Sequence, residues 1–352
     1  MKLSDFSLIL KPVSMLLKSK RLFFGIVALL IFLSSYWFWL DYRNFVKQPI
    51  HFIGSERSLI LTPGSGINSL AKQLQTKGLI KYPVYLKLLA KINPGFKNLK
   101  AGEYRLRSNM TPEQLLTQLS LGHVIQYAFT IIEGQTAYEI LNNIQSETRL
   151  SPLNPSEPAK LLSVLQIDSS NLEGWFYPET YYFTKGESAL SVLKRATKDM
   201  QQVLRQEWQQ RALDLPYDSA YQALIMASII EKETGIASER EQIAGVFVRR
   251  LRKKMRLQTD PTIIYGIGPT FNGDITWRDK KTATAYNTYI IKGLPPTPIA
   301  MPSQGAIYAA LHPAAGSSLY FVADGTGGHY FSETYAEHEL AVKRMLARNK
   351  KP

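Results

Sequence analysis

An uncharged apolar run near the N-terminus constrains this chain more than any other feature. The segment LFFGIVALLIFLSSYWFWL, residues 22–40, contains no Asp, Glu, Lys or Arg. A helix of about 20 such residues can cross the roughly 30 Å hydrocarbon core of a bilayer. The run is longer than the apolar part of a usual signal peptide, and it ends in Trp37 and Trp39 rather than in a small-residue cleavage site. The sequence therefore predicts one uncleaved transmembrane helix over residues 22–40.

The charges around this run predict its orientation. The segment before it holds a single acid, Asp5, and these cations: Lys2, Lys11, Lys18, Lys20 and Arg21. Positive flanks stay on the cytoplasmic side, so residues 1–21 are predicted as a cytoplasmic tail at the inner membrane. Everything after Asp41 is then periplasmic.

An exported location also decides how the net charge of +14 is interpreted. A basic cluster over residues 249–256 would suggest a nucleic-acid partner in a cytoplasmic protein. Outside the membrane, anionic lipid headgroups or an anionic polymer are better partners for it. A solvated helix face is the simpler alternative.

The segments after the anchor predict a small module and then a larger region. Residues 41–57 show no periodicity and are predicted as a linker. Residues 58–122 predict strand, helix, helix, strand and a further helix, in which Thr111 is the N-cap and Pro112 the first helical residue. This β-α-α-β module contains no paired carboxylates, which favours a binding or spacer role over a catalytic one.

The larger region, residues 123–352, is predicted as mostly helical. A strand is expected over 124–134, helices over most of 188–233, and a helix over 238–255 opened by a capping box of Ser238 and Glu241. Loops rich in Gly and Pro follow, then a hairpin and a C-terminal helix. The fold class is therefore α+β.

Metal and cofactor chemistry have no sequence signature here. The chain has no cysteine, and its five histidines lack ligand spacing. No phosphate-binding or dinucleotide-binding glycine motif is present. We therefore expect neither a metal nor a cofactor.

Two glutamates end the apolar segment LIMASIIEKETG, residues 224–235. At about 100° per residue, Glu233 falls within the stripe formed by the preceding isoleucines and methionine, whereas Glu231 falls opposite. Loss of hydration on an apolar face raises the pKa of a carboxyl, which suits a general acid. Glu231 is expected to be solvated, or paired with Lys232 or a following arginine. A buried structural acid remains an equal interpretation of Glu233 on this geometry alone.

Several longer motifs resemble one family. They are LEGWFYPETY (172–181), ASIIEKETGIASER (227–240), RLQTDPTIIYG (256–266), TAYNTYIIKGLPPTPIAMP (284–302), AALHPA (309–314) and YFVADGTGGHYFS (320–332). Together they are similar to the endolytic murein transglycosylases of the YceG-like family, in the family's order. The anchor and residues 58–122, which resemble that family's LysM-like domain, extend the similarity. One departure is Gly235-Ile236, where many relatives have other small residues.

The resemblance implies a catalytic role for Glu233, the second glutamate of the EKET motif. It implies a lysozyme-like or YceG-type catalytic domain that cleaves the MurNAc–GlcNAc bond within peptidoglycan strands and leaves 1,6-anhydroMurNAc ends. Such an enzyme terminates nascent strands near peptidoglycan synthases, which are the partners it implies. One acid/base suffices there, because the C6 hydroxyl of the sugar attacks its own anomeric carbon, whereas glycosidases usually employ two carboxylates.

Further residues are candidates for binding sugar. AYN at 285–287 is similar to an element of lysozyme-like transglycosylases that flanks the acid, although a plain turn is the alternative. Asp260 is also the best candidate for a second carboxylate, or else a turn residue before Pro261. Aromatic residues near 175–181 could stack on sugars, but such residues more often form a core. The candidates are Gln258, Thr259, Asp260, Tyr286, Asn287, Glu179 and Tyr177.

Two other functions remain open. A hydrolytic muramidase would use Glu233 together with Asp260. A cell-wall-binding scaffold without activity would hold glycan through residues 58–122.

Overall fold

The structure is a computed structural model that describes residues 10–50, 52 and 56–349. The first nine residues of the expected tail, and part of the expected linker, lie outside the described residues. Contacts divide the chain into an N-terminal unit, Met1–Ile125, and a C-terminal unit, Gln126–Pro352. The sequence-based border at 122/123 lies close to this division. Each unit has its own apolar core.

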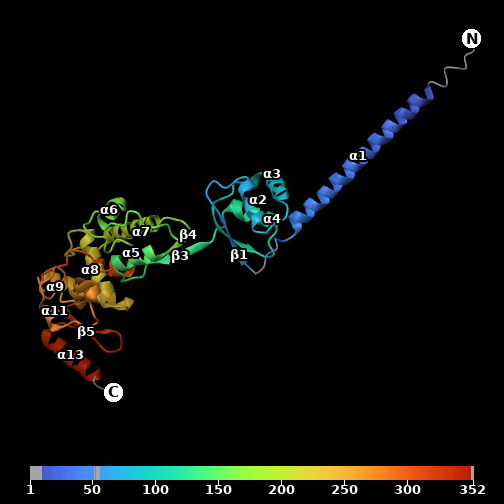
Figure 1. Ribbon diagram of the computed structural model, residues 1–352. Coiled ribbons are helices and arrows are strands. Elements are labelled where there is room, and N and C mark those ends of the chain that lie inside the picture. The colour runs from blue at the N-terminus through green and yellow to red at the C-terminus, as the bar shows by residue number, and fades with distance from the viewer. Residues whose placement is uncertain (1–9, 51, 53–55, 350–352) are drawn as a thin grey trace, which may run out of the picture. The chain divides into compact units, whose positions relative to one another are not determined.

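The N-terminal unit contains one long helix and the module that follows it (Figure 1). Its elements are α1 (Leu10–Lys47), β1 (Glu56–Leu61), α2 (Ile67–Thr76), α3 (Pro83–Ile92), the 3₁₀ turn η1 (Pro94–Phe96), β2 (Gly102–Arg107) and α4 (Pro112–Leu121). The antiparallel pair β1–β2 and the helices enclose a core that includes Leu59, Leu70, Leu86 and Leu116. The predicted order of strands and helices in residues 58–122 is confirmed.

Helix α4 begins where its sequence predicts, after Thr111. Thr111 accepts a hydrogen bond from the backbone N–H of Gln114, whose side chain in turn accepts from the Thr111 N–H, so the two form a capping box. Gly122 ends the helix in the left-handed conformation, with φ of 78°, where a residue with a Cβ would be strained.

The expected linker over residues 41–57 is wrong in its first part. Helix α1 runs without a break from the apolar run to Lys47, and Ile50 is already buried in the module's core. The polar residues after Leu40 continue the helix because aromatic side chains among them pack on α3. The segment Leu22–Lys47 is long and apolar enough to cross a membrane, a property that some signal sequences share.

The C-terminal unit is mostly helical, with two short two-stranded sheets among its described residues. Its elements are β3 (Gln126–Thr130), α5 (Ala137–Ser146), α6 (Pro158–Val164), β4 (Thr180–Thr184), α7 (Ala189–Gln209), α8 (Ala220–Glu233), η2 (Ala237–Glu239), α9 (Arg240–Arg252), α10 (Asp260–Ile267), η3 (Gly268–Thr270), α11 (Trp277–Lys281), α12 (Gln304–Leu311), β5 (Tyr320–Ala323), β6 (His329–Ser332) and α13 (Tyr335–Asn349). Strand β3 pairs with β4, and β5 with β6, both antiparallel. The predicted C-terminal hairpin and helix are confirmed.

Helix α8 lies at the centre of this unit. It packs against α7, α9, α10 and α12, and every residue from Ala223 to Ile230 is buried. The sequence suggested an apolar stripe along one side of α8. Because these residues are buried on every side, such a stripe does not distinguish Glu233 from Glu231. What distinguishes the end of α8 is the set of polar partners that it meets there.

Two expectations about α9 are wrong. Ser238 does not cap this helix, because residues 237–239 form a 3₁₀ turn and the N-cap position is Glu239, whose carboxylate instead binds His329. The basic cluster is not a uniformly solvated face either. Arg249 donates to the carbonyls of Ser318 and Ala314, and Arg250 is only 7% exposed.

Candidate active site

Glu233 lines a polar pocket in the C-terminal unit, which we call the acid pocket. Its volume is about 380 Å³. It is bounded by the end of α8, by α9, by the segment leading into α10, by β5 and by α13. The lining side chains are Glu233, Arg250, Leu257, Gln258, Asp260, Tyr289, Tyr320, Phe321, Val322, Tyr335 and His338.

The carboxyl of Glu233 is poorly hydrated and forms few hydrogen bonds to other residues. The Thr259 hydroxyl donates a hydrogen bond to its Oε1. Burial raises the pKa of Glu233 to about 7, although the Thr259 hydrogen bond opposes this rise; the negative charge of nearby Asp260 adds to it. A carboxyl with this pKa is protonated in a large fraction of molecules near neutral pH, so it can donate a proton.

Glu231 has a different environment from the one expected. Its side chain is only 7% exposed, so the expectation of a solvated acid is wrong. It accepts hydrogen bonds from the backbone N–H and the hydroxyl of Ser303, and it lies 3.6 Å from Arg240. Pairing with a following arginine was the other expectation, and the structure confirms it. Because Ser303 also caps α12, Glu231 has a structural role.

Three consecutive candidates, Gln258 to Asp260, reach Glu233 or its pocket. Thr259 is buried and bonds to Glu233, while Gln258 and Asp260 line the pocket. Gln258 has a φ of 53°, the left-handed region that a residue with a Cβ adopts only when neighbours hold it there. Arg250 holds this segment, since its Nη1 donates to the carbonyls of Arg256 and Leu257.

Asp260 lines the acid pocket and also forms an ion pair. The hydroxyl of Tyr289 donates to Oδ1 of Asp260 at 2.6 Å, and Nζ of Lys280 lies 3.2 Å from the same oxygen. Asp260 begins α10, where a carboxylate is favoured by the helix dipole. Tyr289 and Lys280 therefore fix the position of its carboxyl group beside Glu233.

The remaining candidates are not among the side chains that line the acid pocket. Asn287 is 1% exposed and its amide donates to the carbonyls of Asp279, Lys280 and Thr282. The Tyr286 hydroxyl bonds with Thr297, and its ring packs edge-on against Tyr265.

Tyr177 and Glu179 belong to the structure around β4. The backbone of Tyr177 donates to Ala196, and its carbonyl accepts from the Tyr181 hydroxyl. The carboxylate of Glu179 accepts from the N–H of Thr180. The expected core role of the neighbouring aromatics is confirmed, since Phe176 and Tyr181 are buried.

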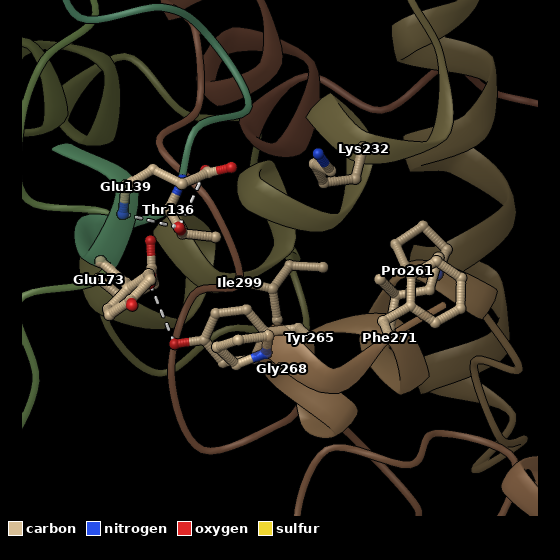
Figure 2. Close-up of a pocket in the computed structure, with 12 residues that line it drawn as sticks. Thr136, Glu139, Glu173, Lys232, Pro261, Tyr265, Gly268, Phe271 and Ile299 are labelled. Carbon is tan, nitrogen blue, oxygen red and sulfur yellow. Dashed lines mark hydrogen bonds between the residues drawn. The ribbon is translucent and has the colours of Figure 1, made fainter. Parts of the chain in front are cut away.

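A second pocket, of about 650 Å³, opens where the ends of α5, α8 and α10 meet (Figure 2). We call it the aromatic pocket. Tyr138, Tyr265 and Phe271 contribute rings to it, and Lys232 an ammonium group. Lys232 and Glu233 are consecutive and line different pockets, as do Pro261 and Asp260. The end of α8 and the start of α10 therefore contribute to both pockets.

Glu173 lines the aromatic pocket and was missed in the sequence. It is 2% exposed, and burial raises its pKa to about 7. Oε1 accepts from the N–H of Ala137, the first residue of α5, and Oε2 accepts from the Tyr265 hydroxyl at 3.0 Å, the hydrogen bond drawn in Figure 2. An acid between Leu172 and Gly174 in an aromatic segment was the available signal.

Arg250, Tyr289, Tyr320 and His338 also line the acid pocket without having been predicted to do so. They come from four separate segments, so no local motif joins them. Among the described residues, no group of three or more His, Asp or Glu side chains is arranged to hold a metal ion.

The fold and the acid pocket together define a mostly helical α+β protein in which a polar cavity holds a carboxyl of raised pKa, that of Glu233. The model of the YceG-like family matches residues 59–344, and the chain belongs to that family.

Named relatives agree with this assignment. The chain is 29% identical over 309 residues to the endolytic murein transglycosylase of Bacillus subtilis (strain 168), covering 81% of this chain and 83% of the relative. It is also 29% identical over 322 residues to the endolytic murein transglycosylase of Streptococcus pneumoniae serotype 2, covering 79% of this chain but only 56% of that longer relative. The crystal structure of a putative YceG-like protein from Listeria monocytogenes aligns with a TM-score of 0.51 and 30% identity, covering 82% of this chain and 99% of that one.

Proposed function

We propose that this protein is an endolytic lytic transglycosylase that cleaves the MurNAc–GlcNAc bond inside peptidoglycan strands. The names of its relatives support the substrate. The observation that carries the chemistry is Glu233, a carboxyl with a pKa of about 7 in a polar pocket.

In the proposed reaction, Glu233 donates its proton to the glycosidic oxygen as the C1–O bond breaks. The C6 hydroxyl of the same muramoyl residue bonds to C1 and gives its proton to the Glu233 carboxylate. Glu233 is thereby restored, and no water is consumed. The product end is a 1,6-anhydromuramoyl group.

The neighbours of Glu233 have distinct parts in this scheme. Thr259 orients the carboxyl and stabilises its anion through their hydrogen bond. Asp260, as an anion beside Glu233, supports positive charge developing at C1. Gln258 offers an amide to sugar hydroxyls. The strand extends from the acid pocket into the aromatic pocket, which shares walls with it and presents rings for stacking.

A hydrolytic muramidase is the second candidate, because Asp260 lines the same pocket as Glu233. In that reaction, Asp260 would activate a water or attack C1 itself. Mass spectrometry of products from purified strands separates the two, since an anhydro end lacks one water. Hydrated reducing ends alone would exclude the transglycosylase.

The N-terminal unit is proposed to anchor the enzyme and to contact glycan. Helix α1 would span the inner membrane with its N-terminus in the cytoplasm, which places the catalytic unit in the periplasm near peptidoglycan synthases. The module over 58–122 would hold glycan as a LysM-like domain does. If a Glu233→Gln protein bound strands and the wild type never changed them, a scaffold without activity would be the better assignment.

A further inference from the structure

We propose that the outer face of α3 binds the anionic headgroups of the membrane in which α1 is anchored. The α3 face is defined by Val84, Lys87, Lys91 and Ile92 of the helix together with Lys81 and Tyr82, which immediately precede it. This inference rests on the proposed membrane span of α1. It assigns the N-terminal module a lipid surface in addition to any glycan that it holds.

Contacts with α1 place α3 at the level where the apolar run ends. The ring of Tyr85, on the inner side of α3, lies 5.3 Å from that of Phe38 and 5.6 Å from that of Phe45. The Tyr85 hydroxyl donates to Asp41 at 2.7 Å. Phe38 precedes the end of the apolar run by two residues, or about 3 Å along the helix. A spanning α1 therefore holds α3 beside the headgroup layer.

The outer side of α3 has the composition of an interfacial helix. Its inner residues Leu86 and Leu89 are buried, whereas Val84 and Ile92 are 54% and 57% exposed. Lysines 87 and 91 are exposed on the same side as Val84. Aliphatic side chains flanked by lysines, whose long stems reach outward, are typical of helices that lie in the plane of a membrane surface.

The sequence segment that contains α3 carries charge of one sign, although Asp41 of α1 accepts a hydrogen bond from Tyr85 on the inner side of the helix. Residues 57–102 contain no acid, and their exposed cations are Arg57, Lys72, Lys77, Lys81, Lys87, Lys91, Lys97 and Lys100. Among the side chains that the structure describes, none of the lysines in this set forms an ion pair, although the charge of Asp41 on α1 attracts Lys81. Such a cluster is complementary to anionic lipid, and its distance from the bilayer is fixed by α1. Sugar hydroxyls alone would match neither the charge nor the exposed aliphatics.

The absence of cysteine allows a direct test on the full-length chain. A Val84→Cys variant carries a polarity-sensitive fluorophore and is reconstituted in phosphatidylcholine vesicles with or without phosphatidylglycerol. The emission is expected to shift to the blue and to be quenched by headgroup-located quenchers only when phosphatidylglycerol is present. High salt is expected to reverse both effects.

Charge-matched variants test the lysines. In the Val84→Cys background, K81E/K87E/K91E is expected to lower the docking equilibrium constant on the order of 100-fold. K253E/K254E/K292E makes the same change in net charge with exposed lysines of the C-terminal unit, and it is expected to leave the signal unchanged. Thermal melting checks that both variants are folded.

The outcomes separate this inference from the proposed anchor. A fluorophore at Leu30→Cys reports whether α1 enters the acyl region. If that probe is inserted while the Val84→Cys probe ignores lipid charge, the α3 proposal fails and the anchor stands. A lipid response that survives K81E/K87E/K91E also overturns it. If the Val84→Cys probe responds to soluble peptidoglycan fragments but not to phosphatidylglycerol, the surface belongs to wall polymer instead.

Discussion

Two glutamates of the C-terminal unit, Glu233 and Glu173, have the same pKa of about 7 but opposite surroundings. Both owe the shift to burial. Each oxygen of Glu173 has a fixed donor, and the residue is 2% exposed. Glu233 is half-buried, has the Thr259 hydroxyl as its hydrogen-bond donor, and lines a polar pocket beside an aspartate.

A raised pKa does not by itself identify a catalytic acid, as these two glutamates show. Glu173 joins the start of α5 to Tyr265 on α10, so both of its carboxyl oxygens already accept hydrogen bonds within the protein. Glu233 retains an oxygen that a substrate can approach. We therefore expect chemistry to depend on Glu233 and folding to depend on Glu173.

The largest expected effect is the loss of activity in Glu233→Gln. This change removes the proton donor and keeps the size of the side chain, so strand cleavage should fall by about 10²–10⁴-fold or more. Thermal stability should be retained, and above pH 7 it should rise slightly, because a poorly hydrated charge is removed. The measurement is anhydromuramoyl product per folded enzyme, with a melting curve for each variant. Full activity in this variant would remove Glu233 from the mechanism.

Glu173→Ala should have the next largest effect, and on stability. It leaves the buried N–H of Ala137 and the Tyr265 hydroxyl without their acceptor, and each such loss costs about 1–3 kcal/mol in the free energy of unfolding. The melting temperature should fall by several degrees, while the protein that remains folded should retain kcat for cleavage, with any change confined to KM because Glu173 and Tyr265 line the aromatic pocket. If cleavage is abolished in fully folded Glu173→Ala protein, the distinction between the two acids is wrong.

The pH dependence of stability provides a further test of the difference between Glu173 and Glu233. Because the folded pKa of Glu173 is about 7 and a free Glu titrates near about 4.3, folding favours the protonated form. Its stabilisation is complete below about pH 4 and is lost as the pH rises through about 7. The difference in unfolding free energy between wild type and Glu173→Gln should follow this curve. A difference that is flat with pH would contradict the raised pKa.

The sequence predicted the elements of the N-terminal module well because its signals are local. Thr111, Pro112 and Gly122 determine where α4 begins and ends through contacts within a few residues. Glu233 was predicted through the family motif and an expected loss of hydration; it lines the acid pocket, and its catalytic role stays a prediction. The role of Glu231 was only half predicted, because Ser303 lies far along the chain and α8 is covered on every side.

Most of the pocket could not be predicted for the same reason. Arg250, Tyr289 and His338 meet only after distant segments pack together, and each alone resembles an ordinary surface or core residue. Asn287 shows the converse, since a residue in a suggestive motif is buried among backbone carbonyls. The continuation of α1 beyond Leu40 depends on aromatic contacts with α3, which the local sequence does not reveal.

Glu231→Gln should have a smaller effect than Glu173→Ala. The amide oxygen can still accept from Ser303, but the attraction to Arg240 is lost. Arg240 retains Glu133 at 3.9 Å, so we expect a cost of about 1–3 kcal/mol rather than the larger cost of an isolated buried charge. Denaturant unfolding measures this cost, and cleavage per folded protein should remain close to wild type. Loss of cleavage at unchanged stability would show that Glu231, and not Glu233, performs the chemistry.

Thr259→Val should have the smallest effect and the most specific one. The Thr259 hydroxyl stabilises the charged form of Glu233, so its removal raises the pKa of Glu233 further. Cleavage requires the protonated acid, so in the wild type kcat/KM should decline as the pH rises through about 7, and in the variant this decline should move to higher pH. The maximal rate should stay within about tenfold, because the proton donor itself remains. Thr259→Ser keeps the donor and should leave the profile in place. A decline that moves to lower pH in Thr259→Val, or that moves equally in both variants, would mean that this hydrogen bond does not control the acid.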